Sequence, residues 1–467
     1  MTDSPPRGVL LERRSAAADA GTAAPPPAYR QALEFLADRA RTVPGRLRVL
    51  GALLVLLTLL FGALAAIQIS QSRAAADRVV NHSQPLSDDA AQLYHSLADA
   101  DTTAATAFLQ AGNETAAVRD RYNQDITTAA TLLAQSAERS TGSGTSQNQI
   151  RLLNAQLPVY TGLVEEARAD NRQGLPLGGA YLRYASAQMQ QTMLPEAQKL
   201  YAAETAALRS DYADARALPW AAIVFGVLAL AALVWSQVRL FRRTNRVFNI
   251  GLVTGTAALA VGLLWVVVAQ LLAGIYLGDS DRKGAAPIQV LSQARIAALQ
   301  CRGAENLNLV ARGSTDSYEQ TWTQVAAQLN GGNGWLPQAS RMTSADAEAK
   351  SAVASAEKWF GTWQQRHDAA KAANDSGSYD TAVADTIGNA SAGGSGSSAT
   401  TATTDAAFAA LDAKLETAIA EERSTFASSA DDGRNAVTGL AVGSAVLAVV
   451  AAAAAVLGIG RRLSEYR

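Results

Sequence analysis

Four long apolar segments constrain this chain more than any other feature. They are residues 49–67, 218–235, 250–277 and 436–460, and none contains Asp, Glu, Lys or Arg. Each is long enough to cross a hydrocarbon layer of about 30 Å as a helix. Residues 68–217 separate the first pair and residues 278–435 the second, whereas only a short Arg-rich turn lies between the pairs. This spacing predicts a membrane protein with two similar modules on one face of the bilayer.

The distribution of charge predicts which face carries the modules. Residues 1–48 hold eight Arg and five acids, the turn Val238–Asn249 holds four Arg and no acid, and the tail after Gly460 holds three Arg and one Glu. The two modules together hold 25 basic and 35 acidic residues. Because Lys and Arg gather in short cytoplasmic loops, we expect a multi-pass plasma-membrane protein with both termini in the cytoplasm and both modules outside.

These features divide the chain into consecutive domains. In order, they are a basic, Pro-containing cytoplasmic head at 1–48, a first span at 49–69, a first bundle at 70–217, a second span at 218–238, an Arg-rich turn at 239–249, a third span at 250–277, a second bundle at 278–435, a fourth span at 436–460 and a cytoplasmic tail at 461–467. The second bundle includes a Gly/Ser/Thr linker at 388–404, a composition typical of flexible segments. The first apolar segment begins only after 48 residues, so we expect a retained anchor rather than a cleaved signal peptide.

Both modules show a helical period. In the first, apolar residues recur at alternating steps of four and three from Leu86 to Ala111, the pattern of a helix packed along one seam. Breaks near 112, 141–146 and 172–179 delimit further helices, and Pro195 is expected to interrupt the last one at a helix start. Since a module begins and ends at the bilayer, it needs an even number of helices, and four fit best. The predicted fold is all-α, with four transmembrane helices and two extracytoplasmic four-helix bundles.

The second module repeats the order of the first. Pro85 precedes Gly112 by 27 residues, and Pro287 precedes Gly313 by 26. The tripeptide Glu-Thr-Ala occurs at 204–206 and again at 416–418. Matches in the same order along both modules predict an internal repeat.

No catalytic, cofactor-binding or metal-ligating constellation stands out. His82, His95 and His367 are scattered without partners at zinc-site spacing, and His95 is expected at the surface or boundary of its bundle. The single cysteine, Cys301, lies on an apolar helical stripe and is expected to pack as a small apolar residue. We therefore expect a non-enzymatic protein with no cofactor, no metal and no nucleic-acid partner.

The spans also lack the residues of a transport path. Ionisable side chains inside a bilayer usually mark ion or proton routes, and here Gln270 is the one strongly polar side chain well inside an apolar run. The pairs Gly251/Gly255 and Gly439/Gly443 have the spacing that favours close helix packing. The pattern argues against a transporter.

Two sets of residues are candidates for contacts at the membrane. The cytoplasmic arginines are expected to contact anionic lipid or, slightly less favoured, a cytoplasmic protein. They are Arg39, Arg41, Arg46, Arg48, Arg239, Arg242, Arg243 and Arg246. In the Gly-rich loop 330–337, Trp335 is equally compatible with the headgroup layer and with packing inside the loop.

Four spans, two external helical modules, cytoplasmic termini and no effector domain resemble the actinobacterial GlnX family. The resemblance covers the layout of the whole chain and transfers no binding residue. It implies a relay in amino-acid sensing, with an extracytoplasmic solute-binding lipoprotein (GlnH) as outer partner and a soluble Ser/Thr kinase (PknG) as inner partner. Two other functions stay open: a cell-envelope scaffold, and a direct receptor that binds a small ligand inside one bundle.

Overall fold

Helices make up nearly all of the computed structural model, and no strand occurs in the part of the chain that it describes. The described residues are 43–110, 113–139, 144–244, 250–312, 316–343, 347–388, 403–436 and 438–464. Among these residues, four helices are long and apolar enough to cross a membrane. The predicted all-α class is therefore confirmed. The head as far as residue 42, and residues 389–402 of the predicted linker, lie outside the described residues.

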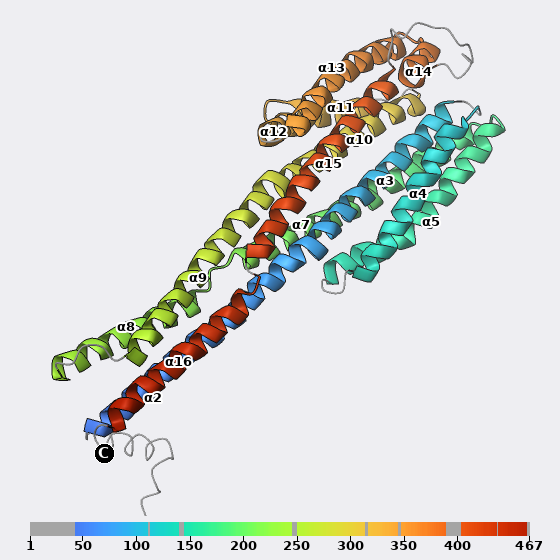
Figure 1. The fold of residues 1–467 in the computed structure, drawn as a ribbon. Helices are drawn as coiled ribbons and strands as arrows, with labels where there is room; N and C mark the ends of the chain where they lie inside the picture. Colours follow the sequence, from blue (N-terminus) through green and yellow to red (C-terminus); the bar gives the residue numbers. More distant parts are fainter. Residues whose placement is uncertain are drawn as a thin grey trace, which may run out of the picture. The chain divides into compact units, whose positions relative to one another are not determined.

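The first module is a four-helix bundle (Figure 1). Its helices are α3 (Gln84–Leu109), α4 (Ala116–Arg139), α5 (Gly144–Arg172) and a return helix made of α6 (Leu177–Gln188), the π-helix η2 (Met189–Met193) and α7 (Leu194–Arg216). Helix α3 packs against α4 and α7, while α5 packs against α6 and α7. Apolar side chains such as Leu93, Leu133 and Leu153 are fully buried between them.

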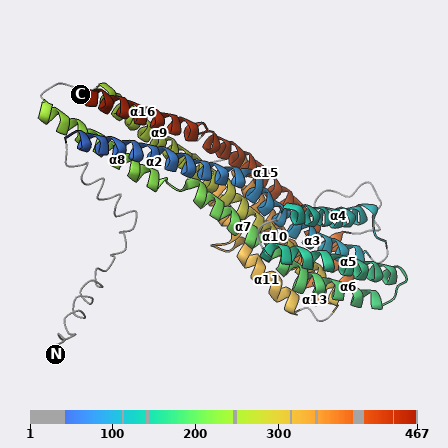
Figure 2. The ribbon, with the colours of Figure 1, turned by 90° about the horizontal axis from the view of Figure 1, so that it is seen from below.

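The second module has the same order, with two of its helices divided. Its helices are α10 (Ala286–Ala311), α11 (Asp316–Asn330), α12 (Trp335–Met342), α13 (Ala347–Asp375), α14 (Tyr379–Ile387) and α15 (Thr404–Ala436). Both modules belong to one compact unit, residues 63–223 and 262–445. Within it, α10 of the second module packs along α3 of the first (Figure 2).

Element lengths repeat between the modules. Helices α3 and α10 each contain 26 residues, and α5 and α13 each contain 29. The turns that follow α5 and α13 each hold a glycine in the left-handed region, Gly174 with φ 70° and Gly377 with φ 82°, where a side chain would be strained. Matching lengths and turn conformations make an internal repeat plausible.

Both leading helices contain a single widened turn. The first runs from α2 (Val43–Arg78) through the π-helix η1 (Val79–Ser83) into α3. The second runs from α9 (Ile250–Ser280) through the π-helix η3 (Asp281–Ala285) into α10. Neither π-helix breaks the chain's helical run, so each leading helix continues from its apolar segment into its bundle.

Proline explains the three π-turns. Gln84, Leu194 and Ala286 each precede a proline, and each donates its N–H to the carbonyl five residues earlier. A proline ring collides with the carbonyl four residues before it in an α-helix, and the wider π-turn removes that collision. Pro195 lies in the first turn of α7, at a helix start as expected, but it does not interrupt the helical run, because the chain accommodates the ring by widening one turn.

The other compact unit comprises the described parts of 1–62, 224–261 and 446–467. It contains portions of α2, α8 (Trp220–Thr244), α9 and α16 (Leu440–Ser464). A Cβ added to Gly251 on α9 would lie 2.6 Å from the Cα of Gly458 on α16, and one on Gly255 would lie 3.1 Å from the carbonyl oxygen of Ala451. The first GxxxG pair thus permits close packing of α9 on α16.

Candidate functional site at the contact between the modules

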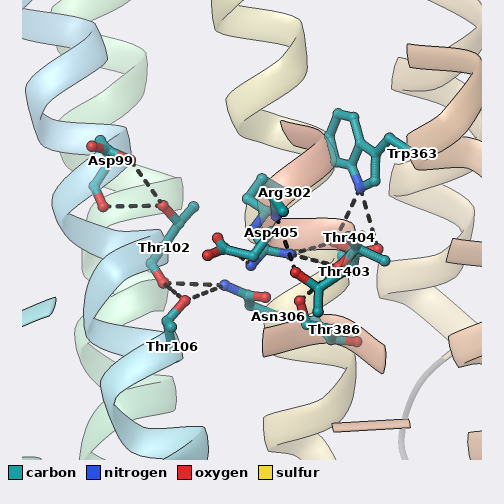
Figure 3. A network of polar contacts seen from close by, with 12 residues as sticks. Asp99, Thr102, Thr106, Arg302, Asn306, Trp363, Thr386, Thr403, Thr404 and Asp405 are labelled. Carbon is teal, nitrogen blue, oxygen red and sulfur yellow. Dashed lines mark hydrogen bonds and ion pairs between the residues drawn. The ribbon is translucent and has the colours of Figure 1, made fainter. Parts of the chain in front are cut away.

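Hydrogen bonds join α3 of the first module to α10 of the second (Figure 3). The Asn306 amide donates to the Thr102 backbone carbonyl and to the Thr106 hydroxyl, both at 3.1 Å. All three residues are buried. A buried polar group left without a partner costs free energy, so such bonds favour one register of the two helices over others.

Arg295 on α10 joins three helices. Its guanidinium donates to the Asp412 carboxylate on α15 at 2.8 and 3.0 Å and also to Glu416. The same group lies 2.7 Å from Nε2 of His95 on α3. Burial opposes ionisation of Asp412, but Arg295 and His95 outweigh it and hold the pKa of that carboxyl well below its usual range. The second module thus covers His95, which by itself would lie at the boundary of its bundle.

The second module contains a buried charged network. Arg302 on α10 donates to Glu305 at 2.6 Å and to Asp405 on α15 at 2.7 Å. Glu305 also accepts a hydrogen bond from Nε1 of Trp363 at 3.2 Å and lies 3.0 Å from Nδ1 of His367, both on α13. Arg302, Glu305, Trp363 and His367 are at most 4% exposed. Four side chains from two helices therefore form one satisfied cluster inside the bundle.

Contacts in this cluster keep His367 charged. Burial by itself would lower the pKa of His367, but Glu305 and Glu319 outweigh it and raise that pKa to about 9. Burial would raise the pKa of Glu305, but His367 and Arg302 hold it below its usual value. The Trp322 ring stacks on the imidazole with centroids 3.7 Å apart, a placement that favours the protonated form. The cluster is thus a set of paired charges at neutral pH.

Asp101 in the first module is buried among neutral donors. Its carboxylate accepts hydrogen bonds from Ser186 at 2.9 Å, from Gln190 at 3.0 Å and from Tyr160 at 3.4 Å. Burial raises the pKa of Asp101, and these three hydrogen bonds offset that effect only in part. A carboxyl group in this setting is sensitive to any shift of α5, α6 or η2, because each of these elements supplies one donor.

Another set of contacts lies where the bundles meet the long apolar helices, and it is here called the collar. It consists of Arg78, Asp211, Tyr212, Ser280 and Phe426. Arg78 at the end of α2 donates to Asp211 on α7 at 2.7 Å. The hydroxyls of Tyr212 and Ser280 lie 2.9 Å apart, and Ser280 at the end of α9 donates to the Phe426 carbonyl on α15 at 3.3 Å. The collar therefore links the four chain segments that lead toward the predicted spans.

Two glutamine side chains near the spans hydrogen bond to backbone groups beside the helix break at residues 217–219. Gln270 on α9 donates to the carbonyl of Ala217 at 3.1 Å. The backbone N–H of Ala222 donates to the side chain of Gln68 on α2 at 3.0 Å. Backbone groups freed by a break need partners where water is scarce. Gln270, the polar exception in the apolar runs, thus satisfies the backbone.

The predicted cytoplasmic arginines are only partly within the described residues. Arg48 on α2 and Arg239 and Arg242 on α8 are exposed. The Arg239 guanidinium lies over the Trp235 ring, 5.0 Å from its centroid. Arg39, Arg41 and Arg246, and the side chains of Arg46 and Arg243, lie outside the described residues. Contact of these arginines with lipid or with a protein stays a prediction.

Trp335 and Cys301 both pack in the second module. Trp335 begins α12 and is half-buried against the apolar core. Its place in the headgroup layer stays a prediction. Cys301 is fully buried, its thiol lies 3.8 Å from the Trp322 carbonyl, and burial raises the pKa of that thiol. Cys301 thus packs as a small apolar residue.

Comparison with known families concerns the first module. Residues 75–213 match the actinobacterial sensor domain. The matched segment begins near the end of α2 and ends in α7, so it includes Asp101 and all three of its donors. The match supports an actinobacterial sensor protein and a role in sensing or signal transduction. No curated protein and no solved structure matches the chain.

Sequence reasoning missed most of the buried polar groups. Arg295 and Arg302 are seven residues apart and therefore share a helix face within an Ala-rich stretch. Charged residues on a face that is otherwise apolar are a signal for buried pairing. Their partners Asp412, His95 and Asp405 are more than 100 residues distant, so nothing local could identify them.

Proposed function

We propose that this protein relays an extracytoplasmic signal across the plasma membrane to a cytoplasmic Ser/Thr kinase. In this proposal both termini lie in the cytoplasm, and a solute-binding lipoprotein that senses amino acids engages the modules from outside. The sensor-domain match supports a sensing role. The resemblance in layout to the GlnX family supports the choice of partners.

The collar is the observation that carries the relay. A displacement of one bundle helix changes the Tyr212–Ser280 and Ser280–Phe426 contacts, and these couple α7, α9 and α15. Small shifts of packed helices are an established mode of switching. The continuous helices through η1 and η3 provide a route from each bundle toward its apolar segment. No ionisable group is needed in the spans for such a mechanism.

A ligand site inside one bundle finds less support. The pocket lined by Glu114, Arg168 and Leu182 in the first module has a volume of ≈ 50 Å³, far below the roughly 300–1,000 Å³ of small-molecule sites. This space suits water rather than a metabolite. The first module therefore fits a role in which a partner protein, rather than an enclosed ligand, changes the helix positions.

The test is made with the full-length protein in its native membrane. Photo-crosslinkers in the turns near 174 and 377 should capture a solute-binding lipoprotein, and crosslinkers in the head should capture a kinase. Tyr212→Phe combined with Ser280→Ala should abolish the solute-dependent change in kinase-substrate phosphorylation without lowering the protein level. Unchanged signalling after deletion of the whole chain would contradict the relay and favour a scaffold.

A further inference from the structure

A groove separates α7 of the first module from α10 and α12 of the second. It has two parts, of ≈ 270 Å³ and ≈ 530 Å³, and both are lined by Gln198, Gln293 and Trp335. Together they fall within the roughly 300–1,000 Å³ typical of small-molecule sites. The groove lies within the single compact unit that holds both modules.

Side-chain amides are the most frequent polar groups that line the groove. They belong to Gln190, Gln198, Gln289, Gln293, Gln300 and Gln328. Gln190 donates to Asp101, Gln300 donates to Tyr94, and Gln289 accepts from Arg209. The other three form no side-chain hydrogen bond with any residue that the structure describes. Three amides are therefore free to bond an occupant.

The chemistry of these groups selects a class of ligand. A glutamine amide both donates and accepts hydrogen bonds, as does a hydroxyl group. Arg209 is the only charged residue among those described as lining the groove, and it is exposed. A cationic or zwitterionic ligand would lack an acidic partner there. The Trp335 ring adds an apolar face, which suits a ligand whose C–H groups lie on one side.

We propose that this groove binds a neutral, hydroxyl-rich molecule of mono- or disaccharide size. Gln198, Gln293 and Gln328 hydrogen bond to its hydroxyls, and Trp335 packs against its C–H face. The site lies between the two bundles rather than inside one. Binding itself is independent of the relay, and only its effect on signalling rests on the proposed function.

The groove is connected to both modules. Gln190 belongs to η2 and also donates to Asp101 in the core of the first bundle. A Cβ added to Gly303 on α10 would lie 3.4 Å from the Gln190 side-chain nitrogen, so α10 passes close to this π-turn. A sugar in the groove would therefore lie beside Gln190 and Gln300, close to the α3–α10 contact. Irregular π-turns at binding sites are a recurrent feature of proteins.

Calorimetric titration of the full-length protein in lipid nanodiscs tests the site. The probes are glucose, N-acetylglucosamine and, as a cationic comparison, glucosamine. We expect saturable binding of at least one neutral sugar, with glucosamine weaker. Gln293→Leu and Trp335→Ala should each weaken binding by about tenfold or more, since each removes a principal contact. Gln364→Leu, at an exposed position on α13, should leave the affinity unchanged.

Two results would overturn the site. One is absence of saturable binding for both neutral sugars in protein with a normal thermal unfolding transition. The other is binding that Gln293→Leu and Trp335→Ala leave unaltered, because the sugar would then lie elsewhere. Sugar binding that depends on Gln293 supports the site even if kinase output is unaffected, so the relay and the site can fail separately.

Discussion

One buried carboxyl group in each module shows opposite ways of holding charge. In the second, the Glu305 carboxylate lies between Arg302 and His367, and these contacts lower its pKa. In the first, Asp101 has only neutral donors, and burial raises its pKa. An unpaired buried carboxylate costs free energy when ionised. The module that matches a sensor domain is thus the one that carries an uncompensated core carboxyl group.

Asp101→Asn should stabilise the first bundle at neutral pH or leave it unchanged. The amide retains an acceptor for Ser186 and carries no charge. The folded-state pKa of Asp101 lies above the ordinary 3.8. The free energy of unfolding should therefore fall as pH rises from about 3.8 through that raised value. Asp101→Asn should lose this pH dependence. Asp101→Leu should cost about 1–3 kcal/mol by leaving donors unpaired. Thermal unfolding across pH 3–8 measures the stability of both variants. If Asp101→Asn lost as much stability at neutral pH as Asp101→Leu, the charge on Asp101 would not be unfavourable in the core.

His367 should make the second module sensitive to alkaline pH. Its pKa rises from 6.5 to about 9 on folding because Glu305 and Glu319 hold the protonated form. The stabilisation, roughly 3 kcal/mol, should be complete below pH 6.5 and lost as pH rises through 9. His367→Gln should remove this pH dependence in thermal unfolding. His82→Gln, at an exposed position, is the matched control, and an equal loss of pH dependence there would refute the assignment.

At the scale of elements, proline and glycine have roles that their spacing predicts only in part. The spacing correctly marks Pro85 and Pro287 as equivalent positions, and each lies in the first turn of a helix of 26 residues. It does not reveal that each proline sits within a continuous helix. That outcome depends on whether the flanking segments have partners to pack against, since packing of both segments favours continuing the helix through a π-turn over breaking it.

Gly251→Ala should weaken the packing of α9 on α16. The added Cβ would lie 2.6 Å from the Gly458 Cα, a contact that requires backbone movement. Overpacking of this kind costs about 1–3 kcal/mol. Gly274→Ala lies on the same helix with nothing within 4 Å of its Cβ, and it should be neutral. Unfolding of detergent-solubilised protein distinguishes the two, and equal stability of both variants would rule out close packing at Gly251.

At the scale of the whole molecule, the contact between the modules depends on buried polar bonds. Arg295→Met should destabilise the protein by about 3–5 kcal/mol, because Asp412 would remain buried without its guanidinium partner. It should also speed hydrogen exchange along α3. Arg423→Met removes the more exposed ion pair with Asp88 and should cost about 1 kcal/mol or less. If both variants lost a similar amount of unfolding free energy, the burial of Arg295 would not be important for stability.

The sequence by itself determined the all-α class, the four apolar segments and the paired order of the modules. These depend on hydrophobic period, segment length and the local conformations of proline and glycine, which neighbouring residues specify. Only the tertiary structure decided the partners of Asp101, Arg295 and Glu305, the π-turns and the amide-lined groove. Those features arise where helices distant in sequence meet, because the burial and pairing of a polar side chain depend on the packed chain around it.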